Sequence, residues 1–397
     1  MPFAISHGAR LYWRQDGAAD KPAIVLLTSI GTDMSIYDPV VPLLTPDFRV
    51  LRMDTRGHGA SDAPAGDYSL DLLADDVLAV MDAAGVAKAT ICGISLGAMI
   101  AMALAPRAPE RVEAMILACT SPAMDPTVWN DRLTLIRAEG LGAITEAVMG
   151  RFFSDAFRAQ HPNAVQTVRA GMLAQSVDGY CGCGAAIRDM ALLDGLPSIT
   201  APTLVITGAK DAATPFGGHG ERIVSAIPGA RHQQVGGAHI PSLEAPAALA
   251  GAVRDFVGEV LHGTAVHDAQ ETLFEAGLET RRKVLGDAWV DQSLAKRTAF
   301  TADYQAMITR YAWNEIWGRP GLDHRTRRLL VLAICASLAR WEEFRLHVRA
   351  GLEQGGFTVD ELKEVLMQTA IYAGVPAANT AFTEAAEVMA ELGVAPV

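Results

Sequence analysis

The hydrophobic positions of this chain follow one pattern in its first two-thirds and another in its last third. In the first part, short continuous apolar runs alternate with longer segments in which apolar residues recur every three or four positions. Continuous runs are typical of parallel strands buried on both faces, and the three-to-four spacing is typical of helices with one buried side. The runs that we predict as strands cover residues 23–27, 49–54, 89–92, 112–118, 203–208 and 232–235. This alternation predicts a doubly wound, mostly parallel sheet.

Two stretches depart from the alternation. Residues 121–200 carry helical patterns, which predict a helical cap inserted over an active site, and a helix over 245–260 closes the first domain. Beyond it the pattern is helical throughout, with expected helices at residues 278–285, 300–317, 325–351, 358–374 and 376–392. We therefore expect an α/β domain over residues 1–262 with a cap over about 122–200, a linker over 263–272 and a separate all-α domain over 273–397.

Composition narrows the classes of function. A length of 397 residues suits two domains, and 50% hydrophobic residues supply a large core. The net charge of -12 argues against binding to nucleic acid or to an anionic membrane. No apolar run approaches the ~18 residues of a membrane span, and the first residues lack the pattern of a signal peptide. The five cysteines form no C-x-x-C pair and no zinc-like spacing, so we expect reduced thiols, no metal and a cytoplasmic location.

Residues 93–97 read Gly-Ile-Ser-Leu-Gly, a G-x-S-x-G sequence between a predicted strand and a predicted helix. A serine on such a tight turn is presented at the end of a sheet as a nucleophile. The alternative is a turn that is merely rich in small residues, but the strand and the helix are both in place. Ser95 is therefore the expected nucleophile, and the backbone N–H groups of Ile30 and Leu96 are the expected oxyanion donors.

Asp211 and His239 each follow a predicted strand, at the edge where Ser95 is expected. The order serine, acid, histidine is that of hydrolases built on this kind of sheet. Asp211 as a turn residue and His239 as a loop residue are the alternatives, and their joint coincidence is improbable. His58 lies in a glycine-rich turn, for which we favour a structural role over that of catalytic base.

These motifs resemble the α/β-hydrolase superfamily, together with the segment Arg56-Gly57-His58-Gly59. Residues 29–35, 129–132 and 179–189 further resemble the 3-oxoadipate enol-lactone hydrolases, although the cap alternates cysteine with glycine at 181–184 where that family usually has adjacent cysteines and alanines. The resemblance implies hydrolysis of an activated lactone. Arg132 in the cap, beside Trp129, is the candidate cation for the carboxylate of the substrate, and a solvated helix arginine is the alternative.

The helical domain resembles the 4-carboxymuconolactone decarboxylases at residues 311–322 and 339–350. The two resemblances imply consecutive steps of the protocatechuate branch of the β-ketoadipate pathway, the decarboxylation needing no cofactor. A homo-oligomer formed through the helical domain is also implied.

Arg340, Glu343 and His347 have the spacing of one face of one helix. On spacing alone, a solvated salt-bridge face is the more common explanation. With the resemblance, His347 is the expected acid, Glu343 its orienting partner and Arg340 an anion clamp. Arg327, in a basic run with Arg325 and Arg328, is a further candidate for substrate binding.

Two other functions were considered for the helical domain. A thiol peroxidase needs a C-x-x-C pair, whereas Cys335 stands alone in this domain. A domain that serves oligomerisation only, attached to a working serine esterase or lactonase, is the main alternative.

Overall fold

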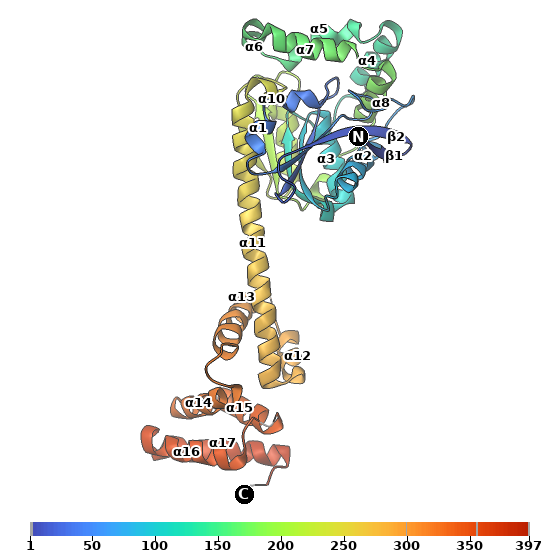
Figure 1. Ribbon diagram of the computed structural model, residues 1–397. Coiled ribbons are helices and arrows are strands. Elements are labelled where there is room, and N and C mark those ends of the chain that lie inside the picture. Colours follow the sequence, from blue (N-terminus) through green and yellow to red (C-terminus); the bar gives the residue numbers. More distant parts are fainter. Residues whose placement is uncertain (1–2, 299, 355, 396–397) are drawn as a thin grey trace. The chain divides into compact units, whose positions relative to one another are not determined.

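Within the described residues, one eight-stranded sheet organises the first part of the chain (Figure 1). The computed structural model describes residues 3–298, 300–354 and 356–395. Its strands are β1 (Phe3–Ser6), β2 (Ala9–Asp16), β3 (Ala23–Leu27), β4 (Arg49–Met53), β5 (Ala89–Ile94), β6 (Val112–Ala118), β7 (Thr203–Gly208) and β8 (Arg231–Val235), in the spatial order β1-β2-β4-β3-β5-β6-β7-β8.

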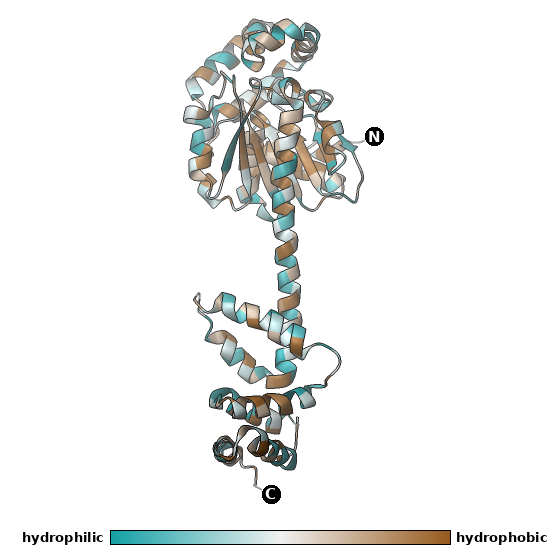
Figure 2. Cartoon of the chain, turned by 90° about the vertical axis from the view of Figure 1, so that its left-hand side faces the viewer, coloured by the Kyte–Doolittle hydropathy of each residue, from teal (hydrophilic) through white to brown (hydrophobic). Residues whose placement is uncertain are grey.

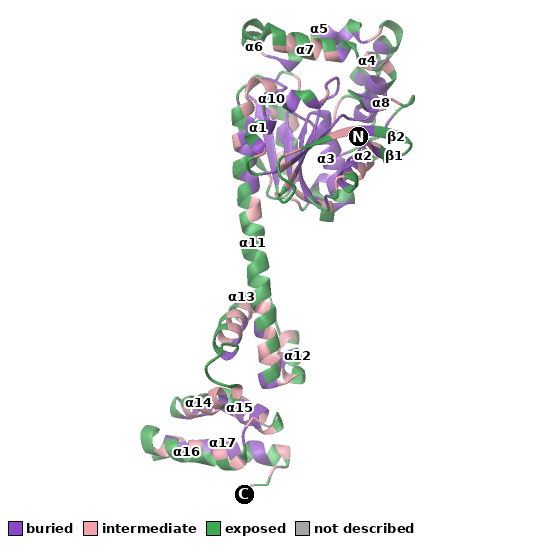
Figure 3. Ribbon diagram, viewed as in Figure 1, coloured by how far each residue is buried: buried purple, intermediate pink, exposed green. Residues whose placement is uncertain are grey.

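The strands from β3 to β8 pair in parallel, and β1 and β2 pair antiparallel at one edge. The continuous apolar runs are the central strands, and every residue of β5 and β7 is buried. Figure 2 shows the hydrophobic character of these strands and Figure 3 their burial. The sequence analysis did not predict β1 and β2, which a turn at His7 and Gly8 with positive φ joins into a hairpin.

Helices cover both faces of the sheet (Figure 1). The helices α2 (Leu70–Ala83) and α3 (Leu96–Arg107) pack against each other. The short α1 (Val41–Leu44) and the first part of α11 (Pro246–Leu285) contribute to the same apolar core as the strands. The remaining short helices are α9 (Glu221–Ala226) and α10 (Pro241–Glu244).

The segment between β6 and β7 is helical, as its pattern predicts. It consists of α4 (Pro126–Glu139), α5 (Gly142–Phe152), α6 (Asp155–Gln160), α7 (Pro162–Leu173) and α8 (Val177–Arg188), and we call these helices the cap. Side chains of α4, α5 and α8 belong to the core that also holds the strands.

The chain divides into two compact units, Met1–Leu261 and His262–Val397. The helix expected over 245–260 continues to Leu285 as α11, so residues 263–272, expected to be a linker, are helical. The second unit contains α12 (Asp287–Ala295), α13 (Ala302–Ile308), a π-helical segment η5 (Thr309–Trp317), α14 (His324–Ser337), α15 (Trp341–Glu353), α16 (Val359–Ala373) and α17 (Val375–Leu392). Among the described helices, none is long and apolar enough to cross a lipid bilayer.

The prediction of a single helix over residues 325–351 is wrong. The chain breaks between α14 and α15, where Ala339 has a φ of 53°. Arg340 therefore precedes α15 as its N-cap residue and is exposed. It does not continue the helical face of Glu343 and His347.

Candidate active sites

Ser95 occupies a strained turn between β5 and α3. Its φ of 56° and ψ of -112° lie outside the regions that side chains favour, and its N–H donates to the carbonyl of Ala118 at 2.9 Å. A Cβ atom on Gly93 would lie 2.2 Å from the carbonyl carbon of Gly97, and one on Gly97 would lie 2.4 Å from the carbonyl oxygen of Leu27. The turn therefore requires glycine at both positions.

Asp211 and His239 form a buried pair. Nδ1 of His239 donates to the Asp211 carboxylate, with oxygen distances of 3.0 and 3.1 Å. The same carboxylate accepts from the N–H groups of Ala213 and Thr214 and from the Thr214 hydroxyl. Burial opposes ionisation of Asp211, but the attraction and hydrogen bonds of His239 and Thr214 outweigh it and lower the pKa to about 2. The carboxylate is thus ionised at neutral pH and fixes the tautomer of His239.

The cap holds the histidine loop in place. The backbone N–H of His239 donates to the carbonyl of Phe152 at 3.1 Å, and the two rings stack with centroids 5.6 Å apart. Phe152 is the last residue of α5 and is buried. The sequence analysis missed this residue, since no motif marks an aromatic side chain that positions a distant loop.

Ser95 and His239 line one cavity of about 320 Å³. Trp129 and Arg132 on α4 also line it, as predicted for substrate contact, and Arg151 on α5 is a second cation that the sequence analysis did not single out. None of the described residues that line the cavity is acidic. The site therefore favours an anionic ligand, although the protein as a whole is negative.

The guanidinium of Arg132 is fixed by its neighbours but keeps one hydrogen-bond donor without a partner among the described residues. Its guanidinium lies 4.9 Å from the centre of the Trp129 ring, and Nη2 donates to the Tyr180 hydroxyl at 2.5 Å. Within the described residues, its buried Nε has no hydrogen-bond partner. Arg132 is therefore oriented on the cavity wall with a donor still free.

The expected oxyanion donors lie on either side of the nucleophile. Ile30 lines the cavity, and Leu96 follows Ser95 as the first residue of α3. In the described part of the chain, neither backbone N–H donates a hydrogen bond. Both donors therefore remain free for an oxygen atom of a ligand.

His58 fixes the loop that contains Ile30. Its Nε2 accepts from the N–H of Gly31 at 3.0 Å, and Nδ1 donates to the carbonyl of Arg56 at 3.2 Å. Burial lowers the pKa of His58 to about 4, so the ring is neutral at pH 7. This geometry agrees with the structural role favoured from the sequence.

Cys119 places its sulfur within 4.8 Å of ligand atoms of Asp211 and His239, a set that resembles a metal site by element type alone. Burial raises the pKa of the Cys119 thiol well above its usual value, and Sγ donates to the carbonyl of Ala238. The imidazole and the carboxylate already bind each other. The donor set therefore fits a protonated thiol beside a hydrogen-bonded imidazole and carboxylate rather than a metal.

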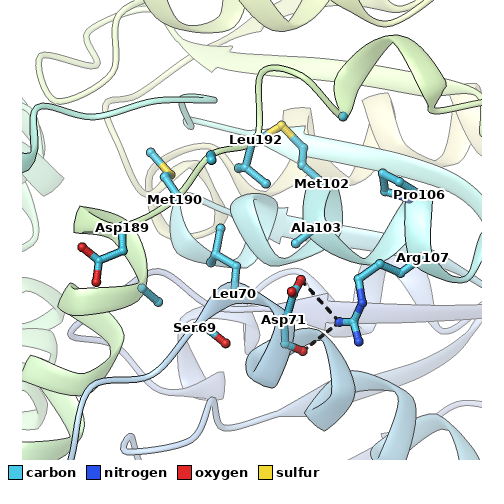
Figure 4. A pocket seen from close by; sticks show the side chains of 13 residues that line it. Ser69, Leu70, Asp71, Met102, Ala103, Pro106, Arg107, Asp189, Met190 and Leu192 are labelled. Atoms are coloured by element: carbon cyan, nitrogen blue, oxygen red, sulfur yellow. Dashed lines mark hydrogen bonds and ion pairs between the residues drawn. The ribbon is translucent and has the colours of Figure 1, made fainter.

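A second cavity of about 420 Å³ lies at the start of α2, away from the triad (Figure 4). Arg107 and Asp71 lie together on its wall, with Nη1 donating to the Asp71 carbonyl at 2.9 Å. Arg107 is paired with Asp71 and Asp189 with Arg188, and none of the predicted site residues lines the cavity. The smaller cavity is therefore the candidate active site.

In the second unit, His347 is buried on α15, and its ring stacks on that of Trp317 with centroids 5.7 Å apart. Burial, together with the positive charge of Arg328, lowers the pKa of His347 to about 4. Glu343 is exposed, and in the described part of the chain no hydrogen bond joins it to His347. The expectation that Glu343 orients His347 is therefore wrong, because the groups that act on the imidazole are its apolar surroundings and a cation.

The predicted arginines of this unit have different surroundings. Arg327 donates to the carbonyls of Leu322 and Arg319, which ties it to the turn before α14. Arg340 is exposed at the break before α15. From the sequence, Arg328 was predicted only as a member of the basic run. It is buried, and its positive charge contributes to the lowered pKa of His347.

Comparison with known proteins agrees with this division. Residues 22–246 match the alpha/beta hydrolase fold family, and residues 302–387 match the carboxymuconolactone decarboxylase family. The chain is 33% identical to 3-oxoadipate enol-lactonase 2 of Acinetobacter baylyi over 60% of this chain and 89% of that relative. It is 44% identical to 4-carboxymuconolactone decarboxylase of the same organism over 32% of this chain and 93% of that relative.

The chain belongs to both families. A crystal structure of the enol-lactonase from Burkholderia xenovorans is 37% identical and has a TM-score of 0.63, covering 65% of this chain and all (100%) of that protein. The α/β-hydrolase fold class, the helical decarboxylase-like region and both resemblances found in the sequence are confirmed.

Proposed function

We propose that this protein catalyses two consecutive reactions of the β-ketoadipate pathway. The helical unit decarboxylates 4-carboxymuconolactone to 3-oxoadipate enol-lactone, and the hydrolase unit opens that lactone to 3-oxoadipate. The observation that carries the proposal is the Asp211–His239 pair beside Ser95, in a cavity lined by two arginines and no described acidic residue. The relatives of both units support the same pair of activities.

In the hydrolase unit, His239 removes the proton of Ser95 as its oxygen attacks the lactone carbonyl. The N–H groups of Ile30 and Leu96 stabilise the oxyanion, by analogy at roughly 3 kcal/mol per donor. The ring C–O bond then breaks, the enol oxygen leaves with a proton from the imidazolium, and the enol becomes a ketone. Water next attacks the acyl group and frees Ser95.

Arg132 binds the carboxylate of the lactone. Its free Nε and its fixed guanidinium support this role, and Arg151 adds a second positive charge on the same wall. A carboxylate bound there directs the ester group of a small lactone toward the serine. An exposed surface arginine would lack this orientation.

In the helical unit, the C–C bond to the leaving carboxylate breaks. The electron pair moves through the ring double bond to the carbonyl oxygen of the lactone. The resulting dienolate is protonated at carbon. His347 supplies that proton, and a nearby cation stabilises the oxyanion. The atoms and electrons balance without a cofactor.

We further infer that the second unit associates with other copies of itself. Most of the exposed large apolar side chains in the described residues belong to this unit, including Ile371, Tyr372 and Val375. Apolar patches of this kind on a small unit mark protein–protein contacts.

Incubation of the purified protein with 4-carboxymuconolactone tests the proposal. We expect CO2 and 3-oxoadipate in equal amounts, with the enol-lactone as an intermediate. An esterase whose helical unit serves association only would release no CO2 from this substrate, while it would still open added enol-lactone.

A further inference from the structure

Arg328 is a buried cation that lacks a counter-charge. It lies on α14 with 3% of its surface exposed, and Nη2 donates to the carbonyl of Val284. In the described part of the chain, its Nε and Nη1 have no hydrogen-bond partner, and no ion pair includes Arg328. An unpaired guanidinium in an apolar environment costs several kcal/mol of stability. A bound anion would complete its surroundings.

A second unpartnered donor lies beside it. His347 is 8% exposed, and its buried Nδ1 has no hydrogen-bond partner among the described residues. Trp317, which stacks on His347, and Val284, whose carbonyl accepts from Arg328, belong to the same apolar cluster, so the two groups lie in one part of the unit. Trp317 stacks on His347 with the ring planes 2° apart and forms an aromatic wall on that side. The pair thus offers free N–H groups next to a flat apolar surface.

The backbone packs closely against the guanidinium. Gly356 lies against Arg328, and a Cβ atom at this position would be 3.2 Å from Nε and 3.3 Å from Cζ. The φ of Gly356 lies outside the left-handed region, so backbone strain does not explain the glycine. The close approach of the backbone to the guanidinium does, because a side chain at this position would crowd Nε.

We propose that Arg328 and His347 form the binding site of the helical unit for the oxyanions of a carboxylated lactone. This assignment rests on the proposed decarboxylase function. It adds to the site of the helical unit Arg328, which the sequence motif did not single out. A cation on the leaving carboxylate would hold back the electron pair that must depart with the C–C bond. Arg328 therefore donates to the carbonyl oxygen of the lactone, where negative charge grows during the reaction. His347 lies beside the carbon that is to be protonated.

The variant Arg328→Met removes the cation and keeps much of the apolar bulk. We expect kcat/KM for CO2 release to fall on the order of 10- to 100-fold or more, the loss associated with a hydrogen bond to a charged group. Because the charge is unpaired without substrate, the thermal midpoint of the unliganded protein should stay equal or rise. A cation with a structural role would give a lower midpoint instead.

Gly356→Ala is the second variant, since it keeps the charge and the bond to Val284 but crowds Nε. We expect a smaller loss of kcat/KM, with the folded protein intact. Two matched controls should stay at wild-type activity: Gly263→Ala, where an added Cβ meets nothing within 4 Å, and Arg282→Met, whose guanidinium is paired with Asp287 and Asp291.

Failure of the two proposals is distinguishable. Absence of CO2 release by the wild-type protein would contradict the proposed decarboxylase function itself. Wild-type CO2 release together with unchanged kcat/KM in Arg328→Met would overturn the anion site alone. A parallel fall of activity and thermal midpoint in Arg328→Met, with Gly356→Ala at wild-type activity, would also overturn it by making Arg328 structural.

Discussion

Ser95 and His239 owe their positions to residues that take no part in bond making. Gly93 and Gly97 permit the backbone at Ser95, and Phe152 fixes the loop of His239 through its carbonyl and its ring. The strained φ of the nucleophile persists because strands and helix on both sides determine it. Packing thus fixes the positions of Ser95 and His239 before any substrate binds.

Ser95→Ala should abolish lactone hydrolysis and leave decarboxylation intact, because the two reactions use side chains of different units. The expected observation is accumulation of enol-lactone from 4-carboxymuconolactone, with CO2 release at the wild-type rate. Added enol-lactone serves as the direct substrate for the hydrolase measurement. Loss of both activities in a folded Ser95→Ala protein would show that the reactions share one site.

His347→Ala should reduce decarboxylation on the order of 10²-fold or more and spare enol-lactone hydrolysis, which is the internal control for folding. The lowered pKa of His347, about 4, adds a pH dependence. An acid must be protonated to act, and the protonated fraction in the free enzyme falls as the pH rises above that value. We therefore expect kcat/KM for CO2 release to decrease between about pH 5 and pH 8.

Glu343→Gln provides the comparison for His347, because Glu343 is exposed and not bonded to the imidazole. We expect near-wild-type CO2 release from it. A large loss in Glu343→Gln with full activity in His347→Ala would move the acid role to the carboxylate.

At the scale of elements, glycines set how closely the cap packs. A Cβ on Gly182 of α8 would lie 2.7 Å from ring carbons of Tyr68, and one on Gly184 would lie 2.5 Å from a methyl group of Leu133 on α4. The backbone of Tyr68 in turn donates to the carbonyl of Gly182. The alternation of cysteine and glycine at 181–184 therefore reflects close approach of α8 to its neighbours.

Gly182→Ala should destabilise the hydrolase unit by about 1–3 kcal/mol, because the added methyl group overlaps a buried aromatic ring. Gly150→Ala is the matched control, since it lies in the cap helix α5 with nothing within 4 Å of its Cβ. Helix propensity predicts that this control is neutral or gains up to about 1 kcal/mol. Denaturant unfolding measures both, and equal stability of the two variants would contradict the packing argument.

The sequence predicts elements well where burial sets one clear period. Residues 23–27, 112–118 and 203–208 are strands at the predicted boundaries. His239 pairs with Asp211 and shares a cavity with Ser95, because each of the three follows a parallel strand. The break at Ala339 was missed because no glycine or proline marks it. The positive φ of Ala339 ends α14, where the N–H of Arg340 donates to the carbonyl of Cys335. The buried environment of Arg328 was missed for a related reason, since spacing does not reveal which side of a basic helix faces the core.

At the scale of the whole molecule, the two units expose different surfaces. Near the turn between α16 and α17, Met367, Ile371, Tyr372 and Val375 have between 51% and 82% of their surface exposed. An apolar cavity of about 210 Å³ between the same two helices adds to this surface. Exposed apolar side chains of this density are disfavoured in water, and association with a second copy would cover them.

The full-length protein should therefore be an oligomer at micromolar concentration, as measured by light scattering coupled to size exclusion. Replacing Ile371 and Tyr372 together by aspartate should weaken the association, because two desolvated charges would face an apolar contact. Ile5→Asp is the control, since Ile5 is 65% exposed in the first unit and should leave the oligomer unchanged. A wild-type monomer, or equal dissociation of both variants, would contradict association through the helical unit. Hydrolysis of enol-lactone should persist in the dissociated variant, because the proposed triad and its cavity consist of residues of the first unit.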